Sequence, residues 1–185
     1  LDVGYGVTSW WKVELEGEWE KESGHGYSYN ATEIENIFQL TEAGEYWLDA
    51  GVKAAYEFSH EQGGADKAEI FALLAKKTTQ FTHIANIGLE QEVNEDTRNR
   101  NPELAAKWMT EYHWKPMLNP GFEYYADFGE LSDPSDYKDQ KHHLGPVIYG
   151  QLAPGVKYEL GWLFGLSKAT EDHVVKFNLE YEFPL

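Results

Sequence analysis

The sequence predicts an all-β protein, and more narrowly a transmembrane, antiparallel, up-and-down β-barrel. Three observations predict this fold. Apolar residues alternate with polar ones at a period of two, the alternating segments are long, and short connections alternate with longer polar ones. The 185 residues are enough for one domain, so we expect residues 1–185 to form a single barrel.

The last segment of the chain shows the alternation most clearly. From Val175 to Phe183 every second residue is aliphatic or aromatic, and most residues between them are charged or polar. The segment from Trp11 to Glu20 behaves in the same way, with a glutamate at every second position from Glu14 onward. A helix would instead need apolar residues three and four positions apart. Because only alternate residues of a barrel strand face lipid, the mean hydropathy of -0.59 does not argue against a membrane protein.

The same pattern predicts eleven strands. Most are about 10 to 14 residues long, whereas strands of globular proteins have about 5 to 6 residues. A tilted strand needs about 9 to 11 residues to cross a bilayer. The predicted strands cover residues 1–8, 10–21, 27–40, 45–59, 66–79, 81–93, 105–115, 121–130, 142–152, 156–167 and 173–183.

The connections between these strands alternate in length, as expected of short periplasmic turns and longer outer loops. The short ones are 8–9, 41–44, 79–80, 116–120 and 153–155. The longer ones are 22–26, 60–65, 94–104, 131–141 and 168–172. Aromatic residues collect at both strand ends, for example Trp10 and Trp114 near short turns and Trp19 and Trp108 near long loops. Two such belts are typical of rings anchored at two membrane interfaces.

The strand number has two interpretations, because single-chain bacterial barrels have even counts. A strand missing before Leu1 would give twelve strands, which we favour, and a non-transmembrane segment from Leu1 to Thr8 would give ten. Pro146 lacks a ladder donor, so beside Gly145 we expect it to mark a bulge or a bend. The chain lacks a charged leader with an apolar run, so we expect it to start within a mature protein.

Composition excludes several classes of protein. The net charge of -17 argues against nucleic acid as a partner, and the absence of cysteine excludes disulfides, thiolate metal sites and thiol nucleophiles. A soluble antiparallel barrel or sandwich is the alternative fold, and it would place the charged residues outside. No phosphate loop and no metal-binding spacing is present, so we expect no cofactor and no metal.

In a barrel, the alternate charged residues of each predicted strand would face the interior, and almost no charged residue would face lipid. Buried carboxylates need water, cations or lysine partners, so this row is the candidate functional site. We expect it to line an acidic lumen, with the cation path along segments 10–21 and 27–40. The only two arginines, Arg98 and Arg100, fall in a predicted loop, which disfavours acidic solutes. The selected residues are Glu14, Glu16, Glu18, Glu33, Glu35, Asp49, Lys53, Glu111, Glu123, Lys157, Glu159 and Glu180.

Several junctions resemble a family of uncharacterised proteobacterial outer-membrane barrels that are commonly labelled transporters or porins. The resemblance lies in 142–147, 157–166 and 180–183, and in the junctions Tyr5–Trp11 and Phe38–Asp49. It covers most of the chain and implies an integral outer-membrane location, with the bilayer and lipopolysaccharide as surroundings. The Tyr181-x-Phe183 ending also resembles the aromatic insertion signal of barrels, although Pro184 and Leu185 follow it.

Three functions stay open from the sequence. The first is a channel for small cationic or polar solutes, and the second is a structural or partner-binding barrel, alone or as an oligomer, whose lumen is closed by salt bridges. The third and weakest is an integral membrane hydrolase, which would need a Ser–His or Asp–His group at the rim. The adjacent His142 and His143 should lie on opposite strand faces, which is poor geometry for a metal.

Overall fold

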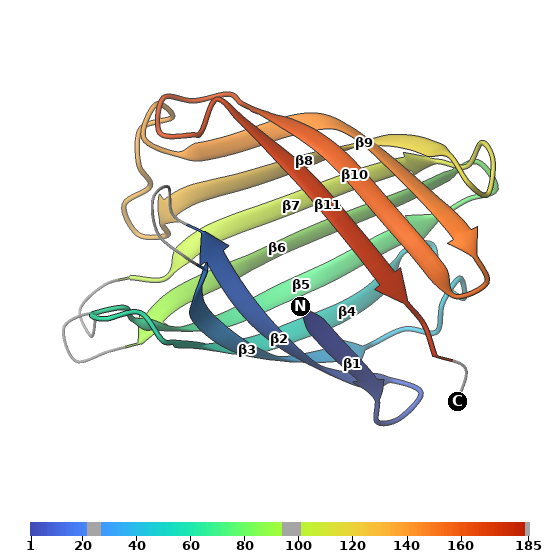
Figure 1. Ribbon diagram of the computed structural model, residues 1–185, viewed down its shortest axis with the longest axis horizontal. Coiled ribbons are helices and arrows are strands. Elements are labelled where there is room, and N and C mark those ends of the chain that lie inside the picture. The colour runs from blue at the N-terminus through green and yellow to red at the C-terminus, as the bar shows by residue number, and fades with distance from the viewer. Residues whose placement is uncertain (22–26, 94–100, 184–185) are drawn as a thin grey trace.

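The protein is described here by a computed structural model that covers residues 1–21, 27–93 and 101–183 (Figure 1). These residues form a single sheet of eleven antiparallel strands, each paired with its neighbours in chain order, and they contain no helix. The described part of the chain therefore has no helix able to cross a membrane. The strands are β1 (Asp2–Gly6), β2 (Trp11–Lys21), β3 (Tyr27–Gln39), β4 (Asp49–Ser59), β5 (Asp66–Lys77), β6 (Phe81–Val93), β7 (Glu103–Tyr112), β8 (Asn119–Glu130), β9 (Lys141–Ala153), β10 (Val156–Gly165) and β11 (His173–Tyr181).

The structure confirms the all-β, up-and-down arrangement and each of the eleven predicted strands. The largest difference in bounds is at β4, which begins at Asp49 rather than at residue 45. The preceding residues form a turn in which Gly44 has a φ of 77° and its N–H donates to Asp49 Oδ1 at 2.7 Å. The predicted connection 22–26 and residues 94–100 of the predicted connection 94–104, which include Arg98 and Arg100, lie outside the described residues.

A bulge or a bend was predicted at Pro146, and the strand register shows no bulge there. The β9–β10 register is the same on both sides of it, since Val147 pairs with Gly161 and Leu144 with Phe164. Only the pairing of the residues between is interrupted, because proline has no N–H to donate. The register shift in this strand pair lies at Val156, next to the turn.

The described sheet is curled but not closed. Its edge strands β1 and β11 are unpaired with each other, and β11 crosses in front of the middle strands in Figure 1. The curvature brings Lys176 on β11 within 2.8 Å of Glu123 on β8, although two strands separate them in the sheet. We call the concave face that carries both residues the inner face, and the opposite face the outer face.

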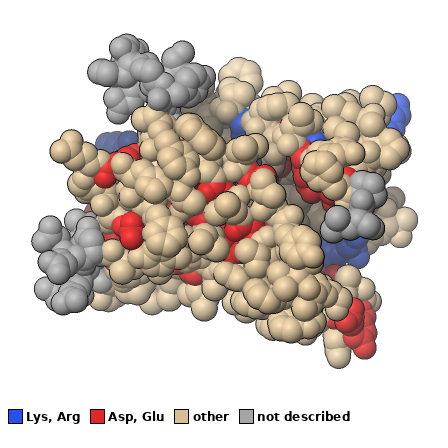
Figure 2. Space-filling view, turned by 60° about the horizontal axis from the view of Figure 1, so that its bottom comes forward, with Lys and Arg blue, Asp and Glu red and all other residues tan. Residues whose placement is uncertain are grey.

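The two faces differ sharply in chemistry. Val175 and Phe177 on the outer face of β11 are 66% and 67% exposed, whereas Glu33 and Glu123 on the inner face are only 6% and 4% exposed. Figure 2 shows a surface of mostly uncharged side chains, with acidic side chains recessed between them. This distribution is the reverse of that in a water-soluble protein, where carboxylates are rarely buried and large apolar residues usually are.

Candidate functional site

The structure places all the residues selected from the sequence on the inner face. The cross-strand register shows this directly, since Glu16 pairs with Glu33 between β2 and β3, and Glu33 pairs with Glu57 between β3 and β4. At the other edge, Lys157 pairs with Glu180 between β10 and β11. The selected residues do not form one site, however, because most of them are spread over two ion-paired groups, an acidic wall and a cavity.

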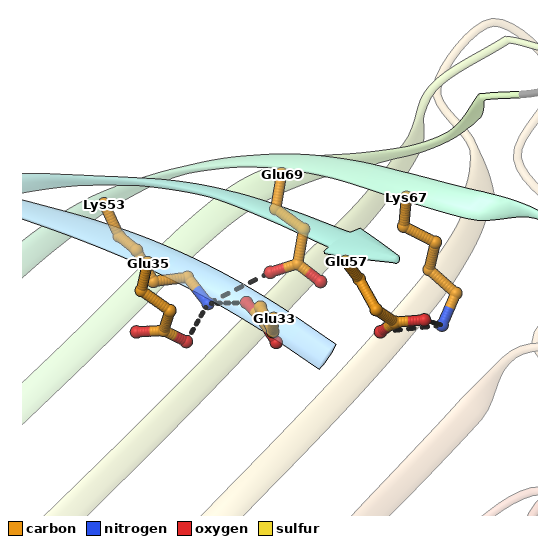
Figure 3. Close-up of polar contacts among 6 residues, drawn as sticks. All are labelled: Glu33, Glu35, Lys53, Glu57, Lys67 and Glu69. Atoms are coloured by element: carbon orange, nitrogen blue, oxygen red, sulfur yellow. Dashed lines mark hydrogen bonds and ion pairs between the residues drawn. The ribbon is translucent and has the colours of Figure 1, made fainter. Parts of the chain in front are cut away.

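Lys53 on β4 is the centre of the first group, which we call the Lys53 cluster (Figure 3). Strand β3 supplies Glu33 and Glu35, whose nearest oxygens lie 3.4 and 2.9 Å from the Lys53 Nζ. Strand β5 supplies Glu69, with an oxygen at 3.0 Å. The exposed fractions of these four side chains lie between 8% and 16%. One ammonium is therefore shared by three shielded carboxylates, which leaves the group with an excess of acid.

The register explains why these groups meet. Glu35, Ala55 and Glu69 form one row across β3, β4 and β5. Ala55 has a small side chain, which leaves room for the ammonium of Lys53 between the two carboxylates of the row. Residues two positions apart lie on the same face of a strand, so Lys53 projects from the face that Ala55 occupies.

Phe71 on β5 packs beside the Lys53 cluster and is only 1% exposed. The Lys53 and Lys107 ammonium groups lie 5.3 and 5.4 Å from the centre of its ring, distances at which cation–π attraction contributes. Phe71 pairs with Gly88 on β6, and a Cβ at Gly88 would lie 2.4 Å from the ring. Glycine is therefore what allows the ring to lie flat against the wall, where it fills the centre of the inner face.

The most acidic wall lies on β2, β3 and β4. The carboxylate oxygens of Glu16, Glu33 and Glu35 come within 4.8 Å of one another, and so do those of Glu18, Glu33 and Glu57. Such groups could hold a cation through oxygen ligands. Among the described residues, Lys53 and Lys67 are the cations paired with these acids, and Lys67 lies 3.2 Å from Glu57. This wall includes segments 10–21 and 27–40, along which a cation path was predicted, and the path itself stays a prediction.

Lys176 on β11 is the centre of the second group, the Lys176 cluster. Its Nζ lies 2.8 Å from Glu123 and 2.5 Å from Glu159. Glu123 also accepts hydrogen bonds from the hydroxyls of Tyr149 at 2.8 Å and Tyr125 at 2.7 Å. The buried carboxylate thus has three donors, which satisfy it without bulk water.

The sequence did not single out several residues of these groups. Glu69 and Lys176 lie in the inward row, but the spacing alone did not show which oppositely charged residues they would meet. The hydroxyls of Tyr125 and Tyr149 were missed altogether, because the alternation identifies aromatic residues only as apolar. A tyrosine in the charged row of a strand is the signal that could have found them.

A cavity of about 600 Å³ lies between the Lys176 cluster and the short-turn end, by which we mean the end with the β5–β6 and β9–β10 turns. Its lining includes Glu111, Lys157, Glu159 and Glu180, four of the residues selected from the sequence. Glu14 and Asp49, which belong to neither the clusters nor the cavity, have local partners. Lys12 lies 2.5 Å from Glu14, and Asp49 caps its turn. At the rim, a hydrogen bond from Lys157 lowers the pKa of Glu182.

His142 and His143 lie on opposite faces. His142 is 3% exposed, stacks on Tyr137 with ring centres 4.9 Å apart and contacts Tyr124 Oη at 2.8 Å. His143 lies 3.2 Å from Glu171. Neither arrangement joins the histidine to an aligned nucleophile and acid, so these residues give no support to the hydrolase hypothesis.

Comparison with models of known protein families gives no match, and comparison with curated proteins gives none either. The resemblance to outer-membrane transporters and porins therefore stays a prediction. The function has to be inferred from the two faces of the sheet, the ion-paired clusters and the cavity.

Proposed function

We propose that the protein is an outer-membrane β-barrel whose acidic lumen conducts small cations. The observation that carries the proposal is the inversion of the two faces, with large apolar side chains exposed outside and carboxylates shielded inside. In a bilayer the outer face would contact hydrocarbon, and the inner face would enclose a wet axis. In water the same sheet would expose an apolar surface far larger than soluble monomers tolerate.

The few polar groups on the outer face support a lipid environment, because they are satisfied locally. Asn36 Oδ1 accepts from the indole N–H of Trp11 at 3.1 Å. Thr110 Oγ1 is hydrogen-bonded to the Trp108 indole at 3.1 Å and to His83 Nδ1 at 3.0 Å. In hydrocarbon no water can satisfy such groups, so partners on the same face are required.

Closure of the barrel belongs to the proposal. The strands alternate in direction, so β1 and β11 run parallel to each other and one further strand between them would be antiparallel to both. Pairing along β1 continues as far as Leu1, whose N and O both bond to Gly17 at 2.8 Å. An open edge would leave N–H and C=O groups unsatisfied in lipid, which favours a closed sheet of twelve strands.

The balance of charge on the inner face favours cations over anions. The wall formed by β2, β3 and β4 carries Glu14, Glu16, Glu18, Glu33 and Glu35, and the cations among the described side chains of these strands are Lys12 and Lys53. Rings of carboxylates in a confined lumen attract cations and exclude anions. Lys53 lies within this wall and would be the positive barrier that limits the current.

Planar-bilayer recording tests this function. The purified protein should give reproducible currents whose reversal potential in a KCl gradient indicates preference for K⁺ over Cl⁻. Substitution Lys53→Met should increase that preference, because it removes the central positive charge. Anion preference, or a selectivity that the substitution leaves unchanged, would contradict the proposed cation path.

A closed barrel is the second candidate, and the burial of Phe71 specifically favours it. A phenylalanine that is 1% exposed on the inner face indicates a filled cross-section at that level. Lys53 and Lys107 over its ring, together with the three glutamates of the Lys53 cluster, would close the rest of the lumen at this level. Absence of current from both the natural protein and the Lys53→Met variant would establish this candidate over the channel.

A further inference from the structure

The cavity at the short-turn end has the size and lining of a ligand site. Its volume of about 600 Å³ lies within the range of about 300 to 1,000 Å³ that small-molecule sites occupy. It is bounded on the inside by Tyr149 and Glu159 of the Lys176 cluster, and it reaches the strand ends at His113 and Gln151. The cavity is therefore a recess that ends at the ion pairs of the Lys176 cluster.

The charges around this recess are largely compensated. Glu159 is paired with Lys176, and Glu180 lies 3.8 Å from Lys157. One oxygen of Glu111 accepts a hydrogen bond from Asn119 Nδ2 at 2.7 Å. Lys77 lies in the same cross-strand row as Glu111, on the other side of Thr82. Unlike the acidic wall on β2 and β3, this region has no large excess of either charge.

The uncharged groups of the lining can both donate and accept hydrogen bonds. Gln151 and Asn178 are exposed to the cavity, and within the part of the chain that the structure describes neither side chain has a hydrogen-bond partner. Each amide offers two donors and one carbonyl acceptor. Ile84, Met109 and the ring of Tyr149 add an apolar surface. A hydroxyl group is also both donor and acceptor, so it matches the two amides better than a lone charge does.

We propose that the recess binds a neutral, hydroxyl-rich small molecule, with the amides of Gln151 and Asn178 as its principal ligands and the Tyr149 ring as a packing surface. This inference deepens the proposed function, because it rests on the inner face being a lumen that solutes enter from the short-turn end. The acidic wall and the recess would then have different roles, one for passing cations and the other for holding a polar solute.

Isothermal titration calorimetry on the folded protein in lauryldimethylamine oxide micelles tests the inference, since this detergent carries no sugar. The probes are glucose, sucrose and myo-inositol, with spermidine and citrate as charged comparators. We expect saturable binding of at least one neutral probe, and weaker or no binding of the charged ones. Failure of all three neutral probes, or tighter binding of spermidine or citrate, would overturn the inference.

The double variant Gln151→Leu with Asn178→Leu should weaken binding of the neutral probe at least tenfold. A matched control is Gln39→Leu, which removes an amide from the inner face of β3, outside the cavity lining, and should leave binding unchanged. If the double leucine variant fails to fold, the pair Gln151→Glu with Asn178→Asp keeps the side-chain shapes and should shift preference toward spermidine. Unaltered binding in folded variants would refute the assignment of the two amides.

The two proposals fail separately. Cation-selective current without binding of any neutral probe would overturn the ligand site and leave the channel. Binding without current in planar bilayers would overturn conduction and leave the ligand site in a closed barrel.

Discussion

Replacing Lys53 with methionine perturbs the most heavily shared charge of the inner face. Methionine retains much of the aliphatic stem but leaves Glu33, Glu35 and Glu69 without their common cation. The Lys53 side chain is 14% exposed and that of Glu33 is 8% exposed, so water can replace the lost contacts only in part. Removing one partner of a buried ion pair costs about 3 to 5 kcal/mol, and we expect a loss of that size in the free energy of unfolding.

The matched control is Lys157→Met at the short-turn end. Lys157 also contacts two carboxylates, those of Glu180 and Glu182, but its side chain is 47% exposed and theirs are 52% and 56% exposed. Exposed pairs contribute about 0 to 1 kcal/mol, so this variant should unfold almost as the natural protein does.

Urea unfolding in detergent micelles, followed by tryptophan fluorescence, measures both variants under identical conditions. The free energy of unfolding of the Lys53→Met variant should fall by about 3 to 5 kcal/mol. Adding Glu33→Gln should restore part of this free energy, because it removes one of the carboxylates left without a cation. Equal and small effects of Lys53→Met and Lys157→Met would refute the conclusion that burial makes the Lys53 cluster energetically different from the rim.

Two further substitutions test the packing of the inner face. Gly88→Ala places a Cβ 2.4 Å from the Phe71 ring and from Ile70 O, so it should reduce the free energy of unfolding by about 1 to 3 kcal/mol. The control is Gly6→Ala, whose Cβ meets no atom within 4 Å. The same urea titration should show almost no change in its free energy of unfolding. Tyr149→Phe removes a hydrogen bond to the buried Glu123 carboxylate, so chemical denaturation should show that the free energy of unfolding falls by about 1.5 to 3 kcal/mol. An unchanged free energy of unfolding would mean that Lys176 and Tyr125 alone satisfy that carboxylate.

Much of the fold follows from the period-two pattern, because in a strand alternation alone decides which residues share a face. The pattern predicted all eleven strands and the common face of Glu14, Glu123 and Lys157. It was less accurate at β4, where Tyr46, Trp47 and Leu48 continue the apolar pattern but belong to the turn that Gly44 and Asp49 stabilise. The hydrogen bond from Gly44 N–H to Asp49 Oδ1 stabilises a turn in place of a longer strand, and the alternation of apolar residues does not show this.

The period-two pattern could not predict which charged residues form ion pairs, for a different reason. Which glutamate meets Lys53 or Lys176 depends on the register between strands and on the curvature of the sheet. Register shifts occur near Trp19, Lys157 and Ala105, and no spacing along one strand predicts them. The contact between Lys176 and Glu123 skips two strands, so it arises only after the sheet has curled. The cavity has the same origin, since its lining comes from seven strands or their ends.

The most direct test of the account is the environment of two adjacent residues on β10, Leu160 on the outer face and Glu159 on the inner face. The chain has no cysteine, so single substitutions Leu160→Cys and Glu159→Cys can each carry one nitroxide label in lipid vesicles. Electron paramagnetic resonance should then show that the label at 160 collides with oxygen and is shielded from a polar nickel chelate, because it lies in hydrocarbon. The label at 159 should be shielded from oxygen dissolved in lipid. Ready access of the nickel chelate to position 160 would contradict the assignment of the outer face to the membrane, and the proposed channel would fall with it.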